Sequence, residues 1–224
     1  AAALLASTSL GAAAQQTTLK LGVLTDMSGP FASQAGEAIG ITADSATREG
    51  IEQVFAAVDA QLGGIDMLVA CAALGAQPIH EMAEDDWRYV VETNLVGYLA
   101  SARAAIQRML AGDGGHLLFV GSISTEIKAA GESVYAATKA GVQAFAETLR
   151  KEVAEQNIKV SVILPGSVGS DMQECTLDEQ RAAIERHEML YAEEIAEAIL
   201  FALTRSARCD VLNLRIEPRL QKTA

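Results

Sequence analysis

Short apolar runs alternate with amphipathic segments of helical length along most of this 224-residue chain. A continuous apolar run such as Met67–Ala72 predicts a strand that is buried on both faces, which is typical of parallel sheets. Apolar residues at helical spacing, as in 51–62, predict helices that cover such a sheet. The alternation predicts an α/β fold, a three-layer Rossmann-like doubly wound parallel sheet in one domain. The expected strands are Ile39–Ala43, Met67–Ala72, His116–Val120, Ile158–Leu164 and Val211–Leu214, with helices over 51–62, 87–99, 142–153 and 192–204.

Composition narrows the classes of function. Half of the residues are hydrophobic, enough for a sizeable core. Lys and Arg number 17 against 29 Asp and Glu, for a net charge of −12, and no basic run stands out. This balance argues against binding of nucleic acid. No apolar stretch is long enough for a transmembrane helix, so no membrane partner is expected.

The cysteines and histidines do not form a metal or disulfide pattern. The three cysteines lie far apart without a CxxC motif, which favours reduced thiols in a cytoplasmic protein. The three histidines share no helix face and no carboxylate spacing, so we expect no metal site. These residues are Cys71, Cys175, Cys209, His80, His116 and His187.

The first residues differ in character from the rest. Residues 1–15 are small, apolar and uncharged, and resemble the end of a secretory signal with an exit at Ala12–Ala14. We assign 1–18 to a signal remnant or an alanine-rich leader; a working signal would direct the chain to the periplasm. The stretch Leu19–Pro30 predicts a strand and a turn-forming loop. Residues 1–35 resemble the start of periplasmic branched-chain amino-acid-binding proteins, so periplasmic small-ligand binding is a weaker alternative.

Tyr135 and Lys139 form a candidate proton-transfer pair. Their spacing of four residues places a phenol and an ammonium group on one helix face. A lysine cation beside a phenol lowers the phenol pKa, which suits proton transfer to or from an alcohol. The alternative is an exposed helical pair without a function.

Two further polar residues precede this pair. Ser122 follows an apolar strand, thirteen residues before Tyr135, and its hydroxyl could bind a substrate carbonyl. Asn94 lies inside the helix over 87–99, where a buried amide could hold a water molecule that relays protons. The alternatives are a capping serine and a satisfied core amide. Ser124 is a possible substitute for Ser122, although the spacing to Tyr135 favours Ser122.

In order and spacing these four residues resemble the Asn–Ser–Tyr–Lys tetrad of the short-chain dehydrogenase/reductase family. The resemblance covers about residues 38–224. It implies that Tyr135 donates or accepts the proton, and that Ser122 orients the carbonyl. It further implies that Lys139 lowers the pKa of Tyr135 and binds the nicotinamide ribose, and that Asn94 anchors a relay water.

The resemblance also implies a site for NADP or NAD. Residues 165–170, Pro-Gly-Ser-Val-Gly-Ser, match the family's PGxVxT segment, in which Ser170 and the backbone of Val168 meet the nicotinamide carboxamide. Asp44 matches the residue that contacts adenine, with capping of the next helix as the alternative. The implied cofactor-binding residues are Asp44, Ala72, Lys139, Pro165, Gly166, Val168 and Ser170.

Two departures from the family pattern affect the cofactor site. Residues 70–73 read Ala-Cys-Ala-Ala where the family has Asn-Asn-Ala-Gly. The glycine-rich TGxxxGIG turn, which binds the pyrophosphate at a helix N-terminus, is missing ahead of Asp44. We therefore expect an N-terminally truncated sheet, with 19–37 a foreign strand and loop. Leu19–Leu24 would then fill the first-strand place beside Met67–Ala72, with 25–37 as a crossover.

The function that follows is an NAD(P)-dependent oxidoreductase that interconverts a small carbonyl compound and a secondary alcohol. The alternative is a non-catalytic, truncated reductase fragment without a working cofactor site. The resemblance implies a homodimer or homotetramer formed through the helices that carry Asn94 and Tyr135. Residues Met172–His187 would be a lid over the substrate or an ordinary surface helix.

Overall fold

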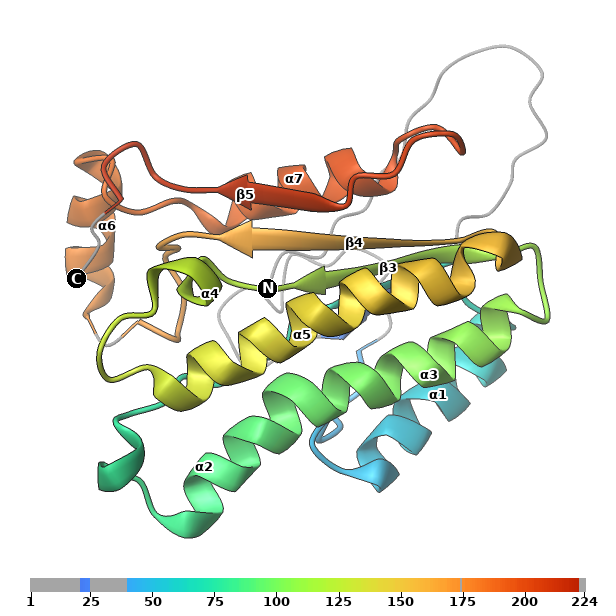
Figure 1. The fold of residues 1–224 in the computed structure, drawn as a ribbon, viewed down its shortest axis with the longest axis horizontal. Coiled ribbons are helices and arrows are strands. Elements are labelled where there is room, and N and C mark those ends of the chain that lie inside the picture. The colour runs from blue at the N-terminus through green and yellow to red at the C-terminus, as the bar shows by residue number, and fades with distance from the viewer. Residues whose placement is uncertain (1–20, 25–39, 174, 222–224) are drawn as a thin grey trace.

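Five parallel strands form the central sheet of the chain (Figure 1). The computed structural model describes residues 21–24, 40–173 and 175–221, the first stretch by its backbone alone. The strands follow one another across the sheet in chain order. They are β1 (Leu21–Leu24), β2 (Met67–Ala70), β3 (Gly115–Val120), β4 (Ile158–Pro165) and β5 (Asn213–Ile216).

Strand β1 pairs in parallel with β2, with Leu21 opposite Met67 and Leu24 opposite Ala70. This pairing confirms that the segment takes the place beside β2, as the hypothesis for Leu19–Leu24 predicts. Residues 1–18, Leu19 and the crossover over 25–37 lie outside the described residues, as does any turn there that could bind a pyrophosphate.

Helices cover both faces of the sheet, which confirms the predicted three-layer α/β fold. On one face lie α1 (Arg48–Leu62), α3 (Gly97–Met109) and α5 (Ser133–Val153), and on the other α7 (Ala192–Leu203) (Figure 1). Neighbouring residues of β3 pack alternately in the two hydrophobic cores, one on each face of the sheet. Phe119 packs with the first group of helices and Leu118 with α7, and both are fully buried.

The remaining elements are shorter. The segment before α3 consists of α2 (Glu84–Val91) and a π-helical turn, η3 (Glu92–Val96), which continues into α3 without a break. The other short elements are two 3-10 turns, η2 and η4, and two helices, α4 and α6. Their bounds are η2 Ile79–Glu81, α4 Ser124–Ile127, η4 Ala154–Gln156 and α6 Leu177–Glu185.

Capping groups explain where two helices begin. The Thr47 hydroxyl accepts a hydrogen bond of 3.0 Å from the Gly50 amide at the start of α1, and Gly63 ends this helix in the left-handed conformation. Thr176 and Glu179 form a reciprocal capping box at the start of α6. In the described part of the chain, none of the helices is long and apolar enough to cross a membrane.

Two predicted strands need correction. The described part of Ile39–Ala43, residues 40–43, is not a strand; it leads into α1, and the Thr42 carbonyl accepts a hydrogen bond from the Gln53 side chain instead of a ladder partner. The last strand is β5, which begins two residues later than the predicted Val211–Leu214. Its register is set by pairing with β4, where Val162 lies opposite Asn213.

Candidate active site

The loop after β3 brings Ser122 to the carboxyl edge of the sheet. The Gly121 amide donates to the Ile163 carbonyl at 2.8 Å, and the Ile123 amide donates to the Pro165 carbonyl at 3.0 Å. These bonds fix the residues on both sides of Ser122 to the end of β4. At this edge of parallel α/β sheets, sites for ligands form between the strand ends and the helices that follow.

Ser122, rather than Ser124, interacts with Tyr135. The Ser122 hydroxyl donates to Ser124 Oγ at 3.1 Å and accepts from the Ser124 amide at the same distance. The Ser124 hydroxyl donates to the Glu132 carboxylate at 2.9 Å and is thereby turned toward the start of α5. A hydrogen bond with Ser122 lowers the pKa of the Tyr135 phenol. The choice of Ser122 over Ser124 agrees with this arrangement.

The pKa of Tyr135 is raised above its ordinary value, which differs from the expected effect of Lys139. Burial is the main cause, the hydrogen bond with Ser122 opposes it, and the negative charge of Glu132 adds to it. The reason lies in the direction of the lysine. Its nitrogen lies 5.7 Å from the centre of the Tyr135 ring and is hydrogen-bonded elsewhere.

Lys139 is buried at the end of β3. Its ammonium nitrogen donates to the Val120 carbonyl at 2.8 Å and to the Tyr98 hydroxyl at 3.4 Å. Burial lowers the pKa of Lys139 from 10.5 to about 8, and the nearby thiol of Cys71 acts in the opposite direction. The predicted sharing of one helix face by Tyr135 and Lys139 is present, with Lys139 buried and Tyr135 half-buried rather than exposed.

Asn94 braces the loop that follows β2. Its side-chain oxygen accepts from the Leu74 amide at 2.8 Å, and its side-chain nitrogen donates to the Leu74 carbonyl at 2.7 Å. The same nitrogen lies 3.5 Å from the Thr138 hydroxyl of α5. The side chain is therefore a satisfied core amide, which ties the β2 loop to the two helices of the site. Its role as the anchor of a relay water stays a prediction.

The implied adenine contact, Asp44, is exposed just before α1. Its carboxylate accepts a hydrogen bond of 2.9 Å from the Ala46 amide. The helix cap is Thr47, so the alternative that Asp44 caps α1 is wrong. Gly50 packs on the backbone of Asp44 so closely that a Cβ atom there would lie 1.9 Å from its carbonyl oxygen.

The segment after β4 fits the carboxamide of a nicotinamide cofactor. The Val168 carbonyl already accepts a hydrogen bond of 2.9 Å from the primary amide of Gln173. This primary amide has the same hydrogen-bonding groups as a carboxamide. The residues implied in this segment, Pro165 to Ser170, are all half-buried, and Ala72 lies half-buried after β2.

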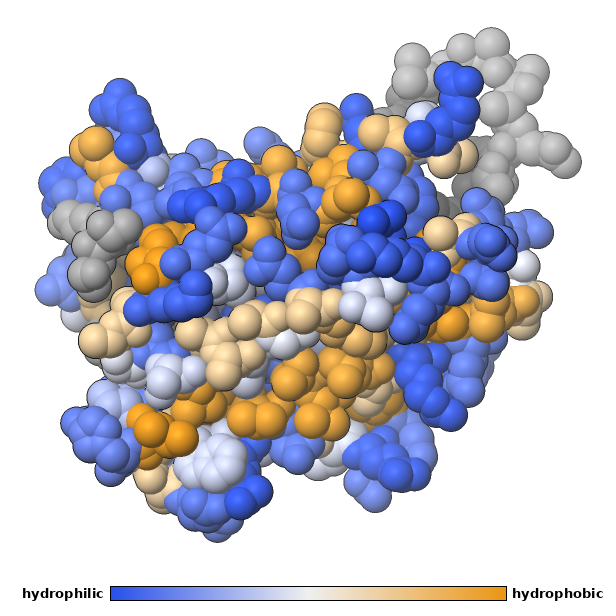
Figure 2. All heavy atoms as spheres, in the orientation of Figure 1, coloured by the Kyte–Doolittle hydropathy of each residue, from blue (hydrophilic) through white to orange (hydrophobic). Residues whose placement is uncertain are grey.

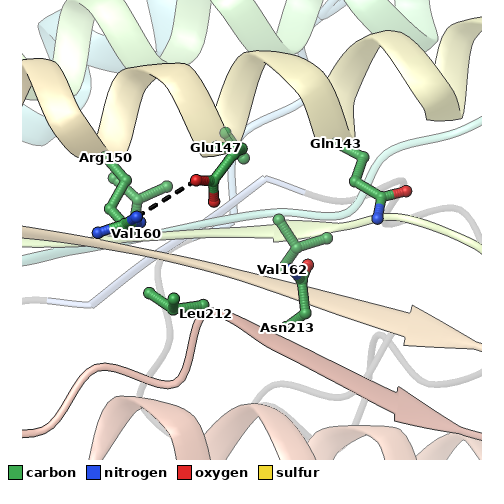
Figure 3. A pocket seen from close by; sticks show the side chains of 8 residues that line it. Gln143, Glu147, Arg150, Val160, Val162, Leu212 and Asn213 are labelled. Carbon is green, nitrogen blue, oxygen red and sulfur yellow. Dashed lines mark hydrogen bonds and ion pairs between the residues drawn. The ribbon is translucent and has the colours of Figure 1, made fainter.

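Two cavities differ in volume and in their place in the fold. The first, about 10 Å³, lies between α5 and the strands β4 and β5; it is lined by Glu147, Arg150 and Leu212 among others and has room for one water molecule at most (Figure 3). The second, about 360 Å³, lies between α6 and the start of the segment after β4, with Ser167, Glu179 and Arg186 in its lining. Only the second is large enough for a small organic molecule.

Two residues of the site, Tyr98 and Glu132, are missing from the sequence prediction. Tyr98 follows Asn94 by four residues, so the helical spacing that joins Tyr135 to Lys139 also joins this pair. Glu132 directly precedes α5 and reaches the site through Ser124. No group of three or more metal-binding side chains occurs within the described ranges.

The fold is a parallel α/β sheet covered by helices, and Ser122, Tyr135 and Lys139 lie at its carboxyl edge. The profile of the short chain dehydrogenase family matches residues 18–181, a stretch that includes β1. The chain belongs to this family. The predicted family, and with it the class of oxidoreductase, is confirmed.

Individual relatives agree with this assignment. The chain is 32% identical over 164 residues to the 3-oxoacyl-(acyl-carrier-protein) reductase FabG of Vibrio cholerae, covering 71% of this chain and 67% of the reductase. It is 32% identical over 188 residues to the NADP-dependent 3-hydroxy acid dehydrogenase YdfG of Salmonella typhi, covering 81% and 76%. The matches thus span about two thirds to three quarters of these relatives.

A solved structure has the same fold. Ligand-free aldohexose dehydrogenase of Thermoplasma acidophilum superposes with a TM-score of 0.75 at 17% identity, covering 90% of this chain and 94% of that one. At this level of identity the likeness bears on the fold alone, and it confirms the Rossmann-like α/β class.

Proposed function

We propose that the chain is an NAD(P)-dependent oxidoreductase that interconverts a carbonyl compound and a secondary alcohol. The observation that carries this proposal is the convergence of Ser122, Tyr135 and Lys139 at the carboxyl ends of β3 and β4. A hydroxyl, a phenol and a buried ammonium group meet there, each held by hydrogen bonds or ring contacts.

Each group has a role that follows from its surroundings. Tyr135 donates its proton to the carbonyl oxygen in reduction and accepts it back in oxidation. Ser122 orients the substrate oxygen toward the phenol, since its hydroxyl already contacts Tyr135. Lys139 supplies a positive charge that favours the phenolate when the proton has left. Asn94 holds the loop after β2 beside α5 through its hydrogen bonds with Leu74 and Thr138.

The nicotinamide cofactor supplies the hydride when bound. Val168 and Ser170 would hold its carboxamide, Lys139 its ribose, and Asp44 its adenine, with Ala72, Pro165 and Gly166 lining the path between them. We propose NADP or NAD as the cofactor, and the NADP named for the Salmonella typhi relative makes NADP the first to test. Because these cofactors are cytoplasmic, we propose the cytoplasm as the place of action.

A 3-oxo or 3-hydroxy acid is the first substrate class to examine. The names of two relatives refer to 3-oxoacyl groups and 3-hydroxy acids. The cavity beside α6, of about 360 Å³, includes the Arg186 side chain, and we propose that residues 172–187 contact the substrate there. Arg186 is paired with Glu188 at 2.9 Å, so an acidic substrate would have to compete for it.

The chain is proposed to form a homodimer or homotetramer through α2, α3 and α5. Tyr89, Val96 and Leu99 are 47%, 41% and 37% exposed on α2, η3 and α3. Figure 2 shows hydrophobic residues gathered over α3 on the face that these helices form, between hydrophilic surroundings. An apolar surface of this kind is typical of an interface.

The test is turnover of a series of 3-oxo esters with NADPH and with NADH. We expect one or more to be reduced, and Tyr135→Phe to lower kcat by about 10²- to 10⁴-fold with the fold intact. Tyr191→Phe, at an exposed tyrosine before α7, is the matched control and should retain full activity. Equal rates for both variants would contradict the proposal.

A further inference from the structure

Tyr98, a buried tyrosine of α3, contacts the lysine of the candidate active site. Its side chain is fixed at both ends. The ring lies 6.1 Å from the Phe119 ring of β3, and the hydroxyl donates to the Val120 carbonyl at 3.2 Å. Only 2% of the residue is exposed. The hydroxyl oxygen therefore has one defined position at the end of β3.

The Lys139 ammonium group lies against both the ring and the hydroxyl of Tyr98. Its nitrogen is 3.4 Å from the hydroxyl oxygen, to which it donates, and 5.1 Å from the centre of the ring. Both distances allow attraction, the second as a cation–π contact. The Val120 carbonyl accepts from Lys139 and from Tyr98, so the three groups form a closed triangle.

A buried ammonium group needs such partners. Lys139 is 1% exposed, and burial without compensation strongly disfavours its charged form. The other titratable groups that face it are the Cys71 thiol and the Tyr135 phenol. The ammonium group needs hydrogen-bond acceptors in this buried place. The phenol oxygen of Tyr98 and the Val120 carbonyl fill that role.

We propose that Tyr98 is a positioning residue whose hydroxyl oxygen and ring face hold the Lys139 ammonium group at the end of β3, beside Tyr135. An aliphatic residue at position 98 would leave the Val120 carbonyl as the acceptor and would remove the ring. The effect of Tyr98 on turnover rests on the proposed function. The contact itself belongs to the chain without cofactor and can be measured there.

The direct test is the pKa of Lys139 in the purified chain without cofactor. Lysine labelled with ¹³C at Cε is followed by NMR from pH 6 to 11, and Lys139→Met assigns the signal. Tyr98→Phe keeps the ring and removes only the hydroxyl. We expect it to lower the pKa of Lys139 by about one unit, since an acceptor of the charged form is lost. Tyr89→Phe, at a tyrosine that is 47% exposed, is the matched control and should leave the pKa unchanged.

An unchanged pKa of Lys139 in folded Tyr98→Phe would overturn the inference. A second measurement leaves the Tyr98 hydroxyl in place. In the chain labelled with fluorotyrosine, the ¹⁹F signal of Tyr98 should titrate with the midpoint of Lys139, and this transition should vanish in Lys139→Met. A Tyr98 signal that ignores the Lys139 titration would likewise overturn the inference.

Turnover separates this inference from the proposed function. In an active wild-type chain, Tyr98→Phe should move the basic limb of the kcat profile to lower pH by about one unit, with KM for the carbonyl substrate unchanged. An inactive wild-type chain whose Lys139 pKa still responds to Tyr98→Phe would refute the proposed function and support the positioning role. An active chain without any response would refute the positioning role alone.

Discussion

Lys139 donates a hydrogen bond of 2.8 Å to the carbonyl of Val120, the last residue of β3. This bond joins the helix that carries Tyr135 to the strand that leads to Ser122. The relative position of phenol and hydroxyl therefore depends on a buried charge. It also explains why the ammonium group points toward the sheet instead of toward the Tyr135 hydroxyl.

Glu132 and Ser122 shift the pKa of Tyr135 in opposite directions, and their variants should do the same. Oxidation of an alcohol requires the phenolate, so its rate rises with pH through the pKa of Tyr135. Glu132→Gln removes a charge that raises this pKa. The rising limb of the pH profile of oxidation should therefore move to lower pH by about half a unit to one unit. Ser122→Ala removes a bond that lowers it, and the limb should move to higher pH.

The pH profile of alcohol oxidation at saturating cofactor measures these shifts. Glu155→Gln, at an exposed residue of η4, serves as the control and should have the wild-type profile. Shifts of the same sign for Glu132→Gln and Ser122→Ala would contradict the assigned roles.

His116 makes the stability of the chain depend on pH. Burial, with a smaller effect of the Lys159 charge, lowers its pKa from 6.5 to about 4, and its ring bonds to the Ser161 hydroxyl at 2.8 Å. Between pH 4 and pH 6.5, the imidazole of His116 is more fully protonated in the unfolded chain than in the folded chain. Stability is therefore full above pH 6.5 and falls as the pH drops toward 4, by about 3 kcal/mol.

Urea unfolding at a series of pH values tests this dependence. His116→Gln keeps a polar side chain beside Ser161 and should flatten the curve between pH 4 and 6.5. A variant with the full wild-type dependence would show that other groups cause it.

Gln173 should compete with the cofactor for the Val168 carbonyl. Its amide occupies this acceptor at 2.9 Å and would have to leave when a nicotinamide carboxamide binds. Gln173→Ala removes the competitor, and we expect the Kd for cofactor to fall by about three- to tenfold, the value of one hydrogen bond. Fluorescence titration measures it, with Gln156→Ala at an exposed position as control. A weaker affinity in Gln173→Ala would mean that Gln173 supports the site instead.

Charges placed at the junction of η3 and α3 should break the proposed oligomer. Val96 and Leu99 lie three residues apart on one side of the helix, both partly exposed. Val96→Glu combined with Leu99→Glu would bury two carboxylates in an interface, and we expect a monomer by sedimentation velocity. Arg205→Glu, at an exposed residue after α7 and outside the proposed interface, is the control. A monomeric wild-type chain would contradict the proposed assembly.

Much of this fold could be predicted because the central strands are buried on both faces. Leu117, Leu118 and Ile163 are fully buried, and such runs stand out in the sequence. The β5 edge of the sheet and the segment before α1 could not be predicted equally well. The register of β5 depends on its pairing with β4, and the segment 40–43 would need a neighbouring strand, which local patterns do not reveal.

The candidate active site likewise has a part that the sequence predicts and a part that it does not. The spacing of Tyr135 and Lys139 is a local, helical property and predicts their common face. The direction of the Lys139 ammonium group depends on Tyr98 and Val120, which are distant in the sequence. Likewise, Asn94, which lies in the π-helical turn η3, contacts Leu74, twenty residues earlier in the chain. Long-range contacts of this kind decide pKa values and lie beyond local sequence patterns.

Titration of the purified chain with NADPH and NADH tests the central claim most directly. Emission of Trp87 and fluorescence of the nicotinamide report binding, and circular dichroism establishes that the chain is folded. Saturable binding with a Kd of about micromolar order is the result that an NAD(P)-dependent oxidoreductase predicts. No binding of either cofactor up to about millimolar concentration, in the folded chain, would leave Ser122, Tyr135 and Lys139 without a hydride source and would contradict it.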